Sequence, residues 1–237
     1  MSYIGTNKVG KMYLGGTAIG KAYLGDNLVF GTSSGQSKDD YISNGLVFHL
    51  DCEDATTSKW VDRKGGIEFA MNNVSIGSDG GVVFSGSSYG YYSENLNFPS
   101  SSSTIEVVVH PSANSGMVFF TNAADMVAFG LGSQIITKSG NGNYRSKYVW
   151  ESTGPFKKFT FAVAGNSLAV RDKSHPTASG TDSWFLKNKG TYIGTRSTSQ
   201  NFLKGSIYQI RIYNRVLTED EILHNQDIDI LKYNITI

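Results

Sequence analysis

The sequence predicts an all-β fold: an antiparallel two-sheet jelly-roll sandwich with a small N-terminal β-repeat module and one short C-terminal helix. Short apolar segments recur along the chain between turn-forming residues, at the spacing typical of strands in a sandwich. The 237 residues include 27 glycines, 13 tyrosines and 13 phenylalanines but only 4 prolines. This composition favours many short strands joined by tight turns over a helical bundle.

The first thirty residues are a repeat with a period of ten. Tyr3, Tyr13 and Tyr23 each begin a copy that continues with an aliphatic residue and a glycine, and the third copy ends at Phe30 and Gly31. Turn residues separate the short apolar segments, so the repeat predicts a β-meander of very short strands. Such a small sheet is marginal in water and needs support from another surface.

The repeat module, residues 1–31, is predicted to serve assembly. Its large apolar side chains would form an adhesive patch if exposed, and its strand edges would stay unpaired, so self-association or docking onto a neighbouring protein is expected. The alternative is that the module packs on its own sandwich domain. The candidate assembly residues are Tyr3, Tyr13, Tyr23, Leu14, Leu24 and Phe30. Residues 32–40 are polar and are predicted to form a linker.

Residues 41–227 carry the strands of the predicted sandwich. Apolar residues alternate along several segments, which predicts one buried face on each strand. The residues expected in the core are Leu46, Phe48, Ile105, Val107, Phe159, Phe161, Ile210 and Ile212.

A capping box near the C-terminus predicts the one helix. Thr218 and Glu221 have the spacing at which each side chain bonds the other residue's backbone amide, so the helix is expected from Glu219 to about Gln226. Residues 228–237 form the predicted C-terminal tail, in which the alternation at 235–237 indicates a short edge strand.

Composition and charge exclude several classes of partner. The net charge is +1 and the basic residues are scattered, so neither nucleic acid nor an anionic membrane is an expected partner. The sequence has no signal-peptide pattern, and no apolar stretch approaches the about 20 residues that span a bilayer. Cys52 is the single cysteine and is expected to be a buried thiol. The four histidines show no metal-ligand spacing.

The stretch 201–222, NFLKGSIYQIRIYNRVLTEDEI, resembles the C-terminal signature of laminin-G-like, concanavalin A-like jelly-roll domains. Upstream, GLVFHLD at 45–51, FSGSSY at 84–89 and TIEVVVHP at 104–111 resemble other segments of that family. The resemblance covers about 41–227 and implies a concanavalin A-like fold. Val108 stands where many members have tryptophan, and serines replace the aspartates of the family's turn. No cofactor is therefore indicated, and a family-type calcium site is left open.

The N-terminal repeats, such as KAYLGDNLVF at 21–30, resemble short repeats that begin virion structural proteins in phages of gut Bacteroidota. This resemblance implies a phage virion structural protein, such as a head or tail fibre, an appendage or a decoration protein. It would be made in the host cytoplasm and would contact other virion proteins. It would also form a homo-oligomer, with a trimer expected by analogy with phage fibres.

The sequence predicts a non-catalytic protein. Glycosidases of this fold need two carboxylates on one face, about 5–5.5 Å apart in retaining enzymes. Glu106 is followed on its strand face by Val108 and His110, which are not acids. Asp227 and Asp229 have the spacing but are expected in a solvated turn after the helix. The alternatives are a carbohydrate-active enzyme, a glycoside hydrolase or lyase of this fold, or a bacterial cell-surface lectin.

Aromatic residues supply the candidate ligand site, because sugar-binding sites use aromatic faces with a few polar partners. Aromatic residues in or beside predicted loops are Tyr89, Tyr91, Tyr92, Tyr144, Tyr148, Trp150 and Trp184. The candidate ligand-binding residues among them are Tyr89, Tyr144, Tyr148, Trp150 and Trp184. Two classes of ligand remain open: a glycan, such as one on the host surface, or a partner protein. The alternative for Tyr148 and Trp150 is packing in the core or at its rim.

Overall fold

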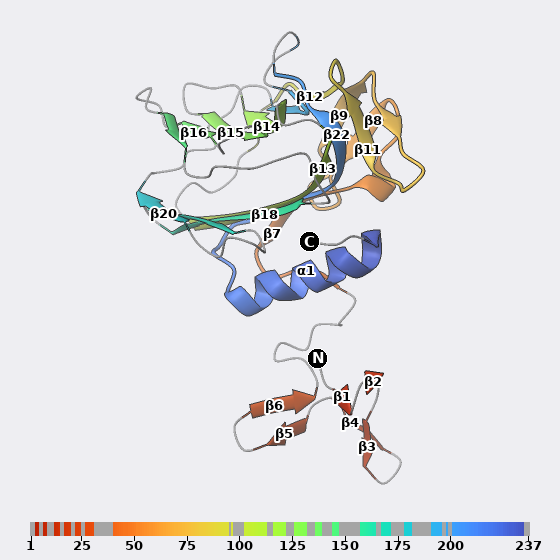
Figure 1. The fold of residues 1–237 in the computed structure, drawn as a ribbon, viewed down its shortest axis with the longest axis vertical. Coiled ribbons are helices and arrows are strands. Elements are labelled where there is room, and N and C mark those ends of the chain that lie inside the picture. Colours follow the sequence, from red (N-terminus) through yellow and green to blue (C-terminus); the bar gives the residue numbers. More distant parts are fainter. Residues whose placement is uncertain are drawn as a thin grey trace. The chain divides into compact units, whose positions relative to one another are not determined.

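The computed structural model divides the chain into two compact units, residues 1–42 and 43–237 (Figure 1). The residues described with their side chains are 40–94, 96, 103–112, 191–195, 198 and 201–234. Outside these ranges, the structure describes strands by their backbone alone.

The N-terminal unit contains three β-hairpins, one for each ten-residue repeat. Their strands are β1 (Tyr3–Ile4), β2 (Asn7–Lys8), β3 (Met12–Leu14), β4 (Thr17–Ile19), β5 (Ala22–Leu24) and β6 (Asn27–Phe30). Two residues, glycine first, separate the strands of each hairpin, and this turn suits a tight reversal. The hairpins are three separate two-stranded sheets. The expectation of one meander was wrong because the two strands of each repeat pair with each other and not with the next repeat. The candidate assembly residues all lie on these strands.

The second unit contains two eight-stranded antiparallel sheets that form its layers (Figure 1). The first sheet has the order β10-β11-β22-β13-β18-β19-β20, and β7 also pairs with β22. Its strands are β7 (Leu46–Asp51), β10 (Ser75–Ile76), β11 (Val82–Ser85), β13 (Ser102–Pro111), β18 (Lys157–Ala164), β19 (Ser167–Arg171), β20 (Ala178–Thr181) and β22 (Lys204–Tyr213).

The second sheet has the order β17-β16-β15-β14-β21-β12-β9-β8. Its strands are β8 (Lys59–Val61), β9 (Glu68–Asn72), β12 (Tyr89–Tyr92), β14 (Gly116–Thr121), β15 (Met126–Leu131), β16 (Ile136–Lys138), β17 (Tyr144–Ser146) and β21 (Thr191–Ile193). A short 3-10 helix, Cys52–Asp54, follows β7. This two-sheet architecture confirms the predicted fold class.

The core lies between the two sheets. Phe48 of the first sheet meets Phe69 of the second edge to face, with ring centroids 6.1 Å apart. The predicted core residues that are buried are Phe48, Ile105, Val107, Ile210 and Ile212. The prediction was wrong for Leu46, which is only half-buried because it begins its strand beside a register shift. The side chains of Phe159 and Phe161 lie outside the described residues. Cys52 is a buried free thiol, as predicted.

Helix α1 (Glu219–Tyr233) lies over the outer face of the first sheet (Figure 1). Its N-terminus has the predicted capping box of Thr218 and Glu221. The predicted end near Gln226 was wrong, and most of the expected tail is helical. The helix continues because Ile228 and Asp229 are buried, and it ends at Asn234 in the left-handed conformation. Residues 235–237, the expected edge strand, lie outside the described residues. Among those described, no helix is long and apolar enough to cross a membrane.

Candidate functional site

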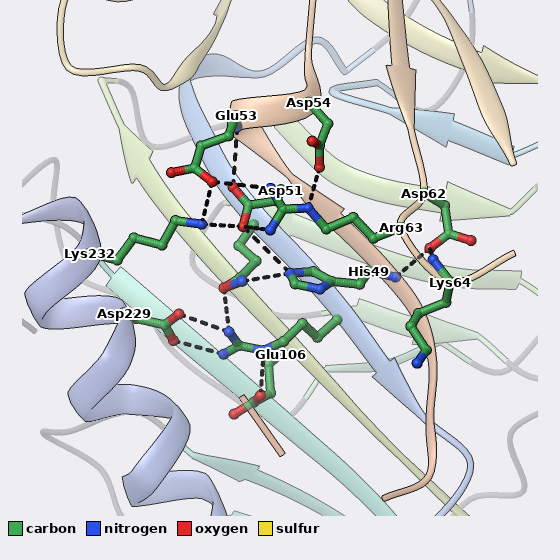
Figure 2. A network of polar contacts seen from close by, with 12 residues as sticks. His49, Asp51, Glu53, Asp54, Asp62, Arg63, Lys64, Glu106, Asp229 and Lys232 are labelled. Atoms are coloured by element: carbon green, nitrogen blue, oxygen red, sulfur yellow. Dashed lines mark hydrogen bonds and ion pairs between the residues drawn. The ribbon is translucent and has the colours of Figure 1, made fainter. Parts of the chain in front are cut away.

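The outer face of the first sheet carries a layer of buried polar side chains beneath α1 (Figure 2). Three neighbouring strands build it in register: Glu106 of β13 pairs with Arg211 of β22, which pairs with His49 of β7. In the next row, Gln209 of β22 pairs with Asp51 of β7. Because side chains alternate along a strand, the neighbours of these residues point into the core while these five face the helix. All five are buried.

Arg211 is the centre of this layer. Its guanidinium donates two bonds of 2.9 and 2.8 Å to the carboxylate of Asp229 on α1 and one of 2.8 Å to Glu106. It also donates to Gln209. Burial opposes the charge of Arg211, but the two carboxylates outweigh it and raise its pKa well above the usual value. Asp229 is therefore buried and ion-paired, and the expectation that it lies in a solvated turn was wrong.

A second group of charges continues the layer towards the 3-10 helix. Asp51 accepts bonds of 2.7 Å from Arg63 and 2.6 Å from Lys232 of α1. The same two cations bond Glu53, at 3.1 and 2.8 Å. Burial first, and then the charge of Arg211, lower the pKa of His49 to about 3. His49 is therefore neutral near pH 7 and can share the 2.9 Å hydrogen bond with the Gln209 amide.

These contacts attach α1 to the sheet. In the layer beneath α1, the buried carboxylates Asp51, Glu106 and Asp229 each have an arginine or lysine partner. A general acid must reach the substrate, whereas these three carboxylates are buried. Among the described residues, no group of three or more His, Cys, Asp and Glu side chains could hold a metal ion.

The outer face of the second sheet has a different character. Tyr91 of β12 lies directly opposite Tyr192 of β21, while the neighbouring pair of Gly90 and Ile193 is buried. The alternation places Tyr89, Tyr91 and Tyr192 on the face turned away from the core, where all three are half-buried. The ring of Tyr192 lies 4.7 Å from that of Tyr91 and 6.3 Å from that of Tyr89, centroid to centroid. We call these three residues the tyrosine triad.

Polar side chains of β9 border the triad. Glu68, Ala70 and Asn72 are exposed and alternate with two buried core residues. Asn72 lies opposite Tyr89, and Ala70 lies opposite Tyr91. Glu68 forms a 3.3 Å ion pair with Lys59 of β8, and both side chains are about half exposed, 56% and 51%. Along its β9 side, the triad therefore has an amide opposite Tyr89 and a paired carboxylate and ammonium farther along the strand.

The turn that resembles the family motif fixes the start of β12. The Ser88 hydroxyl accepts a 3.1 Å bond from the Ser85 amide and donates to the carbonyl of Asn73. Gly86 lies within this turn at a φ of 92°, which favours glycine. These bonds join the turn to β9 and set the position of Tyr89, the first residue of the strand.

The structure places one sequence-predicted ligand residue, Tyr89, in the triad. Tyr144 lies on β17, and its side chain is outside the described residues, as are Tyr148, Trp150 and Trp184. Sequence reasoning missed Tyr192. The available signal was the period of two in this strand. Ile193 predicts a core-facing position, so its neighbour Tyr192 is predicted to face away from the core.

Two stacked antiparallel sheets with a helix on one outer face define a jelly-roll β-sandwich. A laminin-G model described as the concanavalin A-like lectin/glucanases superfamily matches residues 84–223, more than half of the chain. The chain therefore belongs to this superfamily, as the sequence resemblance predicted. No curated protein matches the chain.

Several solved structures share the fold. The Trypanosoma rangeli sialidase, solved with sialic acid, aligns with a TM-score of 0.58 and 16% identity, over 77% of this chain and 33% of its own. Domain 4 of a GH43 extracellular arabinanase from Geobacillus stearothermophilus, in complex with arabinotriose, aligns with a TM-score of 0.54 and 19% identity, over 78% and 98%. The botulinum neurotoxin serotype D binding domain aligns with a TM-score of 0.59 and 14% identity, over 78% and 51%. This chain spans about a third of the sialidase.

Proposed function

We propose that the laminin-G-like domain is a non-catalytic carbohydrate-binding module and that the tyrosine triad is its binding surface. The observation that carries this proposal is the outward-facing group of Tyr89, Tyr91 and Tyr192 with polar side chains beside it. Aromatic faces bind the apolar side of a ligand, and a few placed polar groups fix its orientation. A domain of the arabinanase with this fold was solved with an oligosaccharide bound, which is consistent with the proposal.

The pairing of the acids supports a binding role over a catalytic one. Glu106 and Asp229 flank a buried arginine, and the exposed Glu68 is paired with Lys59. A glycosidase pair would need one carboxyl with a raised pKa at a substrate-accessible position.

The wider proposal is that the chain is a phage virion structural protein, in a fibre, appendage or decoration, with the sandwich binding a glycan or partner protein. The repeats support it: the tyrosine of each hairpin holds the same register position, opposite Lys8, Ala18 and Leu28 in turn. Two-stranded sheets of this size are marginal alone, so other virion proteins or further copies of the chain would stabilise them.

Binding of the full chain to a glycan array tests the proposal. Tyr91→Ala and Tyr192→Ala should each weaken retention of a bound glycan at least tenfold. Tyr91→Phe, which keeps the ring, should retain most of it, and Leu231→Ala on α1 should have no effect. Loss of binding in Trp150→Ala or Trp184→Ala but in none of the triad variants would move the site to the loops. Conversion of the glycan to product would favour the enzyme alternative.

A further inference from the structure

We infer that the tyrosine triad takes a neutral sugar, stacked on the rings with its hydroxyl groups bonded to the polar side chains of β9. This inference rests on the proposed carbohydrate-binding function and names the class of ligand. It follows from the shape of one cross-strand row, the charge balance around it and the hydrogen-bonding groups at its border.

One row of side chains crosses four neighbouring strands. Lys59, Ala70, Tyr91 and Tyr192 lie opposite one another on β8, β9, β12 and β21. Neighbouring strands are about 4.8 Å apart, so the row is long enough for about two sugar rings. The methyl group of Ala70 stands between longer side chains on both sides. The surface is therefore depressed at Ala70. A sugar ring stacked on Tyr91 can extend over this position without a steric clash.

Among the described residues beside the row, the charged side chains of Lys59 and Glu68 cancel in their ion pair. A carboxylate or sulfate on the sugar would have to displace Glu68 from Lys59. Like charges at such distances repel, so an acidic sugar is disfavoured.

The bordering groups match a sugar's hydroxyls. A carboxylate accepts two hydrogen bonds side by side, so Glu68 can bind two neighbouring hydroxyl groups. Lys59 donates, and the Asn72 amide both donates and accepts. Among the described residues, the Asn72 amide makes one long bond of 3.5 Å, to the Ala70 carbonyl, so little is lost when it turns to a ligand. Donors and acceptors thus border the rings on the side of β8 and β9.

Calorimetric titration of the full chain tests the inference. The neutral probes are arabinotriose, cellotetraose and galactobiose, and the acidic probes are sialyllactose and oligogalacturonate. At least one neutral probe should bind, with a Kd that changes less than about twofold between low and moderate salt, since no net charge is neutralised. Glu68→Gln and Asn72→Ala should each weaken that binding about fivefold or more. Asp227→Asn, which removes an exposed acid on α1, is the matched control and should leave the Kd unchanged.

The remaining outcomes separate the two proposals. If only acidic probes bind, in a salt-dependent manner that Lys59→Met abolishes and Glu68→Gln strengthens, the inference is wrong while carbohydrate binding at the triad stands. If neutral probes bind and Tyr91→Ala has no effect on them, the site is elsewhere and both proposals fail. If no probe and no array glycan binds, the carbohydrate-binding function itself is overturned.

Discussion

Arg211 of β22 and Asp229 of α1 form a buried ion pair through two hydrogen bonds of 2.9 and 2.8 Å, and neither side chain is exposed. The pair joins the helix to the middle of the first sheet. Burying an isolated charge costs far more than burying a paired one, so each partner makes the burial of the other tolerable. The position of α1 therefore depends on this contact as well as on apolar packing.

Asp229→Ala should lower the free energy of unfolding by about 3 kcal/mol or more, because it leaves Arg211 with less compensation for its buried charge. Chemical denaturation followed by tryptophan fluorescence measures this. The control is Asp227→Ala, two residues earlier and exposed, which should change stability by less than about 0.5 kcal/mol. Equal effects of the two substitutions would show that the ion pair does not hold the helix.

Stability should fall as the pH falls from about 6.5 towards about 3, because of His49. Burial, with Arg211 next, lowers the pKa of His49 to about 3 in the folded state, against 6.5 in the unfolded chain. The unfolded chain therefore binds one more proton within this window, so protonation favours unfolding. The stabilising effect is full above pH 6.5 and is lost progressively below it.

Urea denaturation between pH 7 and pH 5 isolates the contribution of His49. The ion-paired Glu53 and Glu221 also have lowered pKa values, since Lys232 and Arg215 hydrogen-bond them, and their contribution is lost at lower pH. His49→Gln should flatten the slope of stability against pH in this window. An unchanged slope would show that His49 binds protons equally in the folded and unfolded chains, so its pKa is not lowered by folding.

Two glycines with similar backbone angles should respond very differently to alanine. Gly194, after β21, has a φ of 78°, and an added Cβ would overlap the buried ring of Phe84. Gly66, before β9, has a φ of 68° and open space around it. Gly66→Ala should cost about 1 kcal/mol from backbone strain alone. Gly194→Ala should cost clearly more, by thermal denaturation, because strain and overpacking add. Similar melting temperatures would contradict the packing at Phe84.

The sequence predicted the apolar side of the central strands better than the polar side. Alternation identified Phe48 and Ile105, since burial of one face leaves a period of two. It gave no sign that Glu106 and Arg211, on the opposite face, are buried as well. They are 105 residues apart, and only the pairing of β13 with β22 brings them together. The sequence Asp-Ile-Asp resembled a solvated turn because its partner Arg211, 18 residues earlier, lies on a strand whose contact with the helix the sequence does not reveal.

The same limit applies to the candidate site. The aromatic content directed attention to Tyr89, but Tyr91 and Tyr192 are 101 positions apart, and their rings meet only because β12 pairs with β21. A single sequence contains local period and turn signals. It does not contain the order of strands in a sheet, on which the composition of a cross-strand surface depends.

The N-terminal repeats lead to the last prediction, that residues 1–31 drive self-association. Each repeat forms its own hairpin, and a lone two-stranded sheet is marginal in water, so the hairpins need a further surface. Light scattering should find the full chain oligomeric, with a trimer expected by analogy. A chain starting at Lys38 should be monomeric yet keep the melting temperature of the sandwich, because the sandwich unit begins at residue 43. Replacing Tyr3, Tyr13 and Tyr23 together with serine should have the effect of the truncation, whereas Lys8→Ser, opposite Tyr3 in the first hairpin, should leave the oligomer intact. Two monomers, with the shorter one less stable, would instead mean that the repeats pack on their own sandwich domain.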